Sequence, residues 1–206
     1  MINIGIHTEA QDSGKSYTAI NLALSLTRLG HSVILVDADD SNNNADTSKS
    51  ILDRKPLRDR GFKYFDLEEW KGADNESDYV IFDTSRNPTN GIKSALKTDC
   101  DIVLIPCVNN EKSMQAAEDA LHSMIDSGVR CAIIPNRKND ADTASIRREF
   151  KRAHATITSD LPNDTLSVLL DSGDLLTDAP ANEKENAELT LSRHERLAQE
   201  IIGLIQ

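Results

Sequence analysis

The sequence predicts a doubly wound α/β domain with a mostly parallel sheet, and three observations support this fold class. Short apolar segments alternate along the chain with longer segments of helical periodicity. The apolar segments are hydrophobic at consecutive positions, as expected of strands that helices cover on both faces. The chain has 206 residues, enough for one buried core and short for two. We therefore expect residues 1–206 to form a single domain.

Strands and helices can be assigned from these patterns. Strands are expected at 2–6, 32–37, 79–83, 101–106 and 130–134. Helices are expected at 15–29, closed by Gly30, at 111–127, stopped by Gly128, and near the C-terminus, where Leu197, Ile201, Leu204 and Ile205 form one stripe. We expect residues 41–78 to be a polar surface insertion with one or two helices, and residues 178–187 to be a loop.

Composition points to a soluble cytoplasmic protein. Hydrophobic residues make up 38% and charged residues 28%, and no apolar run approaches the roughly 18 residues that cross a bilayer. The N-terminus has no basic lead before its apolar residues, so it is typical of a first strand and not of a signal peptide. The three cysteines are widely spaced and show no metal-binding pattern, so we expect free thiols in a reducing compartment.

Charge is distributed unevenly. The net charge is −11, which excludes a protein covered in positive charge. Residues 130–155 nevertheless hold seven basic and three acidic side chains, a net charge of +4, which leaves −15 on the remainder. This segment is therefore a candidate basic face on an acidic protein.

A candidate phosphate-binding loop lies between the first strand and the first helix. Residues 9–16 read EAQDSGKS, where Lys15 would reach the β- and γ-phosphates, Ser16 would bind Mg²⁺ and Gly14 would let the backbone approach the anion. A full motif begins with glycine, and Glu9 stands at that position. The alternative is an ordinary helix start, with Asp12 or Ser13 as the N-cap and Lys15 in solvent.

Acidic residues follow the next two strands. The second strand ends in Asp37 and Asp39, and the third ends in Asp83. The carboxyl ends of parallel strands meet at the edge of the sheet where the loop after the first strand also lies. Carboxylates there are expected if Mg²⁺ and an attacking water are held beside a γ-phosphate. Each Asp alone could equally be a turn former or a helix cap.

With these motifs on the chain, the sequence resembles the ParA/MinD-type ATPases with a deviant Walker box, in the compact form without a DNA-binding domain. The Gly-Lys-Ser triplet and the following Asn21 match the phosphate loop and first helix of that family, and residues 37–39 match its D-x-D motif. Residues 79–83, 105–108 and 136–137 match three later motifs. The resemblance covers nearly the full length and implies a P-loop NTPase fold.

The resemblance also implies a site. The nucleotide-binding residues would be Ser13, Gly14, Lys15, Ser16, Tyr17, Asn136 and Arg137, with Asn136 against the base. The cofactors would be ATP and Mg²⁺, and the metal residues Ser16, Asp39 and Asp83. Asp39 would orient the attacking water and, with Lys15, make up the catalytic pair. Because Asp39 can only position water, hydrolysis is expected to be slow.

The loop departs from the family in two ways. The lysine that reaches the partner's nucleotide in the family's dimers falls on Ala10, and the two following glycines are Gln11 and Asp12. Glu9 and Asp12 place two negative charges near a polyphosphate, and they oppose binding unless they are directed away.

Loss of that lysine resembles the McdA-type branch, which distributes carboxysomes and takes the missing charge from a lysine in the C-terminal half. Lys151 is the first candidate for this substitute and Lys138 the second. The alternative for Lys151 is a solvated helix face.

The resemblance implies a positioning ATPase. ATP would close a homodimer, the dimer would bind DNA without sequence preference, and a small adaptor of the McdB or ParB kind would stimulate hydrolysis over the nucleoid. Non-specific DNA binding is phosphate neutralisation, and Arg147, Arg148 and Arg152 are the candidate contacts. The alternative for these arginines is a solvated helix of mixed charge. The C-terminal helix has one basic residue in its last twelve, so no membrane contact is expected.

Three functions remain open from the sequence: a carboxysome-positioning ATPase, a plasmid-partition ATPase, and a nucleotide-binding scaffold that no longer hydrolyses ATP. The missing lysine favours the first, and the acids at 9 and 12 are the reason to consider the third.

Overall fold

A parallel sheet forms the centre of the molecule. The computed structural model describes residues 1–38, 61–72, 76–137, 140–152, 155–159, 161–162 and 181–206. Its strands are β1 Ile2–Ile6, β2 Val33–Ala38, β3 Lys63–Asp66, β4 Tyr79–Thr84, β5 Ile102–Cys107, β6 Arg130–Arg137, β7 Thr156–Ile157 and β8 Leu161–Pro162. They lie in the order β3-β2-β4-β1-β5-β6-β7, and β8 pairs with β6. Every described pairing is parallel, which confirms the predicted fold class.

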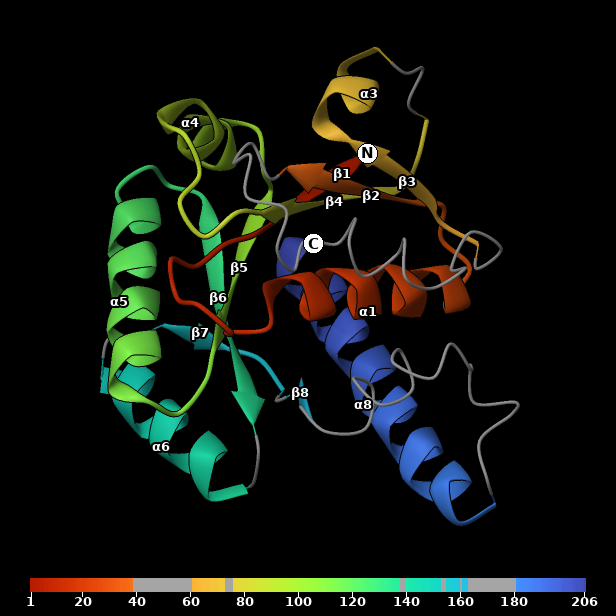
Figure 1. Cartoon of the computed structure of the whole chain (residues 1–206), viewed down its shortest axis with the longest axis vertical. Coiled ribbons are helices and arrows are strands. Elements are labelled where there is room, and N and C mark those ends of the chain that lie inside the picture. Colours follow the sequence, from red (N-terminus) through yellow and green to blue (C-terminus); the bar gives the residue numbers. More distant parts are fainter. Residues whose placement is uncertain (39–60, 73–75, 138–139, 153–154, 160, 163–180) are drawn as a thin grey trace.

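Helices cover both faces of the sheet, as Figure 1 shows. The helices are α1 Lys15–Arg28, α3 Leu67–Gly72, α4 Asn90–Thr98, α5 Glu111–Ile125, α6 Asp140–Arg152 and α8 Ala181–Ile205. Apolar side chains of α1 and α8 pack with one face of strands β1, β2, β4, β5 and β6. Those of α4, α5 and α6 pack with the opposite face of β5 and β6. The strands are therefore buried on both sides, which is why they read as continuous apolar runs.

The ends of two helices follow the glycine signals in the sequence. Gly30 has φ of +92°, its N–H donates to the Thr27 carbonyl, and the His31 N–H donates to the Leu26 carbonyl. This is a Schellman ending, in which the left-handed residue lets the chain satisfy the last carbonyls of α1. Gly128, with φ of +82°, lies three residues after the end of α5. Both helix endings are confirmed.

Two expectations about polar segments are corrected. The segment 41–78 carries α3 but also β3, a four-residue strand that pairs with β2 at the edge of the sheet; residues 39–60 lie outside the described residues. Residues 181–187 belong to α8 and not to a loop. The polar stretch is helical because Glu, Lys and Ala are strong helix formers, and residues 178–180 lie outside the described residues.

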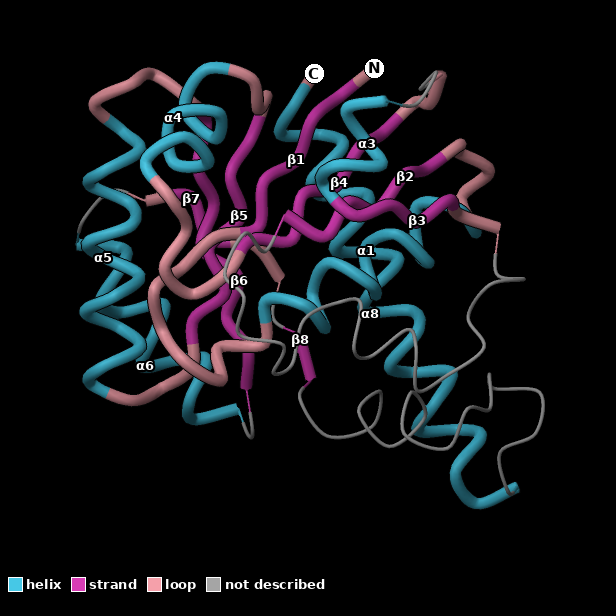
Figure 2. The backbone as a smooth tube through the Cα atoms, turned by 45° about the horizontal axis from the view of Figure 1, so that its top comes forward, coloured by secondary structure: helices cyan, strands magenta, loops and turns pink. Residues whose placement is uncertain are grey.

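The register of the central strands brings the predicted site together. Asp83 at the end of β4 is level with Ile6 of β1 and with Asp37 of β2. The loop after β1 leads from the end of β1, next to the end of β4, to the start of α1 (Figure 2). Asp83 and Asp37 lie near the ends of β4 and β2, so they lie at the same edge of the sheet as this loop. This edge is the candidate functional site.

Candidate functional site

The loop between β1 and α1 has the backbone of an anion cradle. Asp12 and Gly14 have φ of +53° and +85°, and Gly14 is the N-cap of α1, with no capping hydrogen bond from a described side chain. The alternative in which Asp12 or Ser13 caps the helix is therefore excluded. Left-handed residues ahead of a helix turn successive N–H groups toward one point, where the positive end of the helix dipole also acts.

Asn136 fixes this loop from the end of β6. It is buried, and its side-chain amide donates to the Ser13 carbonyl at 2.9 Å. A Cβ at position 14 would lie 2.0 Å from the Asn136 amide nitrogen, so glycine is required there for space as well as for its φ. Ser13, Gly14 and Asn136 are thus brought together as the sequence predicts. Contact of Asn136 with a base stays a prediction, because its amide nitrogen is on the loop.

Lys15 lies over the same loop. Its Nζ donates to the Ala10 carbonyl at 3.1 Å, and the Ser13 hydroxyl donates to that carbonyl at 3.4 Å. Ser16 and Tyr17 are partly buried in the first turn of α1, and Tyr17 packs against the core. The Lys15 ammonium is therefore held against the backbone of the loop at Ala10.

The acidic residues at this edge are buried. Asp83 is 2% and Asp37 6% exposed, and the Tyr64 hydroxyl donates to Asp37 at 3.3 Å. Carboxylate and hydroxyl oxygens are the ligands that Mg²⁺ prefers, so the side chains of Asp83 and Ser16 have the chemistry that suits that ion. The predicted water-positioning residue, Asp39, lies outside the described residues. Within the described part of the chain, no three His, Cys, Asp or Glu side chains form a metal cluster.

Two cations that sequence reasoning missed lie beside the altered part of the loop. Lys93 of α4 forms an ion pair with the Glu9 carboxylate at 2.5 Å. Arg86, in the loop after β4, donates from Nε to the Glu9 carbonyl and from Nη1 to the Gln11 side-chain oxygen, both at 3.2 Å. One signal was present in the sequence: Arg86 follows Asp83 by three residues, which places it at the same edge.

A family model described as the CobQ/CobB/MinD/ParA nucleotide binding domain matches residues 6–204. The chain belongs to this family. No curated protein matches the sequence.

Solved structures share the fold of this CobQ/CobB/MinD/ParA domain at low sequence identity. MinD from Pyrococcus horikoshii complexed with Mg-ADP superposes with a TM-score of 0.68 at 14% identity, covering 100% of this chain and 98% of that chain. Apo McdA from Cyanothece superposes with a TM-score of 0.67 at 17% identity, covering 98% of this chain and 99% of that chain. A putative plasmid partition protein from Borrelia burgdorferi, bound to AMPPNP, superposes at 0.63 and 15%, covering 98% of each chain.

Unlike the residues above, the predicted substitute Lys151 lies away from the phosphate loop of this family domain. It is exposed near the end of α6, beside the start of β7, where Thr156 is level with Ala132 of β6. Asn136 is four residues further along β6, which corresponds to roughly 13 Å of strand. The structure therefore does not bring Lys151 to the loop of its own chain. Lys138, the second candidate, is outside the described residues.

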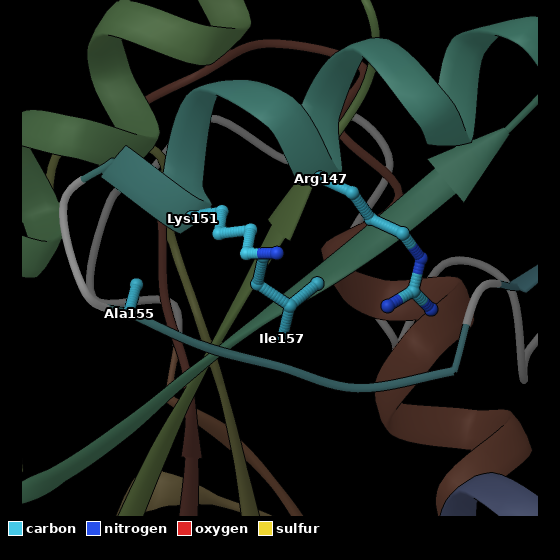
Figure 3. A pocket seen from close by; sticks show the side chains of 4 residues that line it. All are labelled: Arg147, Lys151, Ala155 and Ile157. Carbon is cyan, nitrogen blue, oxygen red and sulfur yellow. The ribbon is translucent and has the colours of Figure 1, made fainter.

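Lys151 instead shares a hollow with one of the predicted DNA-binding arginines. Arg147 and Lys151 project from α6 and, with Ala155 and Ile157, line a cavity of about 530 Å³ (Figure 3). Arg147 also donates to the Thr158 carbonyl at 2.8 Å, and Arg148 is exposed. The side chains of Arg137 and Arg152 are outside the described residues, although both lie in described elements.

His7 joins the ends of β1 and β4 beneath the loop. Thr84 donates its hydroxyl proton to the Ile6 carbonyl at 2.9 Å, so His7 Nδ1, 3.2 Å from that hydroxyl oxygen, must be the donor in their contact. Burial lowers the pKa of His7 from 6.5 to about 4; the Glu9 carboxylate opposes this shift, whereas Lys15 and Lys93 add to it. His7 is therefore neutral at pH 7 and acts as a structural hydrogen-bond donor.

We expect His7 to make the fold sensitive to acid. Between pH 6.5 and 4 the unfolded chain binds a proton at His7 and the native state does not, so the free energy of unfolding falls as the pH falls through this window. The loss attributable to His7 approaches about 3 kcal/mol at pH 4. Urea unfolding at several pH values, compared between the wild type and His7→Gln, measures it. Parallel pH profiles for the two proteins would contradict the assignment.

We expect the Glu9–Lys93 ion pair to protect nucleotide affinity. Lys93→Met leaves the Glu9 carboxylate uncompensated beside the loop, and we expect affinity for Mg-ATP to fall roughly fivefold, since partly exposed pairs are worth up to about 1 kcal/mol. Glu9→Gln in the same chain is expected to restore it. Titration of a fluorescent ATP analogue into the two single variants and the double variant checks this. A double variant as weak as Lys93→Met would show that charge is not the cause.

Proposed function

We propose that the chain is a ParA-type ATPase that binds ATP with Mg²⁺, dimerises in the ATP state and binds DNA without sequence preference. The observation that carries the proposal is the loop before α1, which contains two left-handed residues. Lys15 donates to the Ala10 carbonyl of this loop, and the buried Asp83 is level with Ile6, the last residue of the strand before it. Such a loop offers backbone N–H groups, a helix dipole and a cation to a polyphosphate. The carboxylates of Asp37 and Asp83 do not suit an anion by themselves and are best explained by a metal ion.

In this proposal each residue at the edge has one task. The N–H groups from Gly14 onward and Lys15 hold the phosphates, and Ser16 and Asp83 hold Mg²⁺. When bound, Mg²⁺ would neutralise charge that develops on the phosphates. Asp39 would orient the attacking water, and a carboxylate is a weak general base toward water. Hydrolysis is therefore slow until a partner completes the site.

The α6 helix is the proposed DNA contact. Arg148 is exposed on it, and Arg147 and Lys151 lie one turn apart around the hollow, so three cations lie within two turns. Arg152 follows in the same helix. Phosphate contacts of this kind need no base-reading side chain, and the acidic remainder of the chain would keep DNA on this face. A homodimer would present the face twice, and the protein would then associate with the nucleoid.

The cargo is proposed from the altered loop. McdA and a plasmid partition protein are both among the structures that share this fold. Because Ala10 replaces the family's usual lysine, we favour positioning of a carboxysome-like body through a small McdB-like adaptor over plasmid partition through a ParB-like protein. A nucleotide-binding scaffold without hydrolysis is the alternative, and phosphate release measured with DNA and adaptor present separates it from both. Within the described parts of the chain, no helix has the length and apolar character needed to cross a membrane.

We expect nucleotide to control assembly and DNA binding together. With ATP and Mg²⁺ the protein is expected to sediment as a dimer and to retard a non-specific duplex, and with ADP to do neither. Lys15→Ala is expected to abolish both responses, because it removes the ammonium group that contacts the phosphate loop. Analytical ultracentrifugation and gel shift provide the measurements. Equal affinity for DNA with and without ATP would sink the proposed cycle.

We expect Arg148 to contact DNA phosphate. Arg148→Gln is expected to weaken binding of the ATP-bound protein to every duplex alike and to reduce the slope of log affinity against log salt by roughly one. Arg196→Gln is the matched control, since Arg196 is equally cationic and exposed but lies on α8. Fluorescence anisotropy over a range of salt concentrations measures both variants. If the two variants lose the same amount of DNA affinity, the change in net charge is responsible and not a contact of Arg148 with DNA.

A further inference from the structure

Two cations contact consecutive carbonyl groups of the phosphate loop. Lys15 Nζ donates to the Ala10 carbonyl at 3.1 Å, and Arg86 Nε donates to the Glu9 carbonyl at 3.2 Å. Consecutive Cα atoms are about 3.8 Å apart, so the guanidinium and the ammonium address one short stretch of backbone. One cation comes from α1 and the other from the loop after β4. Asp83 lies in that strand, three residues before Arg86.

Arg86 also decides the sign of the charge on this loop. Glu9 and Asp12 are acidic, Lys93 pairs with Glu9, and Lys15 offsets Asp12, so these four side chains sum to zero. Arg86 brings the sum for the loop and the cations that contact it to +1, before the Asp37 and Asp83 carboxylates at the neighbouring strand ends are counted. A triphosphate carries more negative charge than a diphosphate, and its extra group therefore gains most from a further cation.

The bonds of Arg86 can be exchanged. Its acceptors are a backbone carbonyl and the Gln11 amide oxygen, both uncharged, and among the described residues no carboxylate lies within ion-pair distance of it. A phosphate offers the guanidinium full negative charge and a bidentate geometry, which the uncharged carbonyl and amide oxygens do not. Lys93 differs, because its bond is to the Glu9 carboxylate. Of these two cations, Arg86 is the one that an arriving phosphate can recruit.

We propose that Arg86 leaves the Glu9 carbonyl and the Gln11 amide when a nucleoside triphosphate binds, and bonds the terminal phosphate of that nucleotide. Arg86 is then the residue through which the site distinguishes a triphosphate from a diphosphate. It also links the loop after β4 to occupancy of the terminal position. This inference rests on the proposed function and adds to it the residue that reports the terminal phosphate.

The test compares AMPPNP with ADP, each with Mg²⁺, by isothermal titration calorimetry on the full chain. For Arg86→Gln we expect affinity for AMPPNP to fall at least tenfold and affinity for ADP to change less than twofold. Arg86→Lys is expected to recover part of the preference, since it keeps the charge without the fork. Lys97→Gln, one turn beyond Lys93 on α4, removes the same charge elsewhere and is expected to behave as the wild type.

Several results would overturn the proposal. If Arg86→Gln lowered the affinities for AMPPNP and ADP equally, Arg86 would only stabilise the loop. If both affinities were unchanged, Arg86 would have no part in recognising the nucleotide. If Lys151→Gln lost the preference for AMPPNP over ADP while Arg86→Gln kept it, the cation that recognises the terminal phosphate would be on α6 instead. A wild type that binds neither nucleotide would refute the proposed function itself, which is a different outcome. Thermal unfolding of each variant separates loss of affinity from loss of fold.

Discussion

The parallel register of β1, β4 and β2 is the constraint on which the site depends. It sets Ile6, Asp83 and Asp37 at one level, so the loop that follows β1 starts beside two buried carboxylates. The side-chain period of a strand is two, so a shift of one residue would turn Asp83 to the other face and bring a core residue to the edge. The continuous apolar packing of both faces against helices holds the register, and the chemistry at the edge therefore depends on the whole core.

Charge at the phosphate loop is balanced by residues far away in the sequence. Glu9 stands where the family motif has a glycine, and the ion pair with Lys93 of α4 removes its charge from the loop. Arg86 restores positive charge from the loop after β4. The glycines of an ordinary phosphate loop give freedom to the backbone, whereas here Asp12 adopts a left-handed conformation and Arg86 and Asn136 hold the loop from two sides. The altered motif thus retains its shape by tertiary contacts.

Much of this arrangement could be predicted from the sequence. The remaining features could not be predicted, for physical reasons. The run of apolar residues in β2 and the left-handed Gly30 are local signals, and both were correct. The edge strand β3 has only four partly exposed residues, so no periodicity marks it. Lys93 and Arg86 pair with residues more than 70 positions away, and no spacing rule connects them. The placement of Lys151 could not be predicted either, because it depends on the level at which β7 joins β6.

The contact between Gly14 and Asn136 has a consequence for how this chain can change over time. The amide of Asn136 occupies the space that any side chain at position 14 would need, and it also holds the Ser13 carbonyl. A side chain at position 14 would need Asn136 to become smaller or to retreat, and it would still be strained by the left-handed φ of that position. Although 122 residues separate them, the two positions are therefore coupled: glycine at 14 leaves room for asparagine at 136, and asparagine at 136 excludes a side chain at 14.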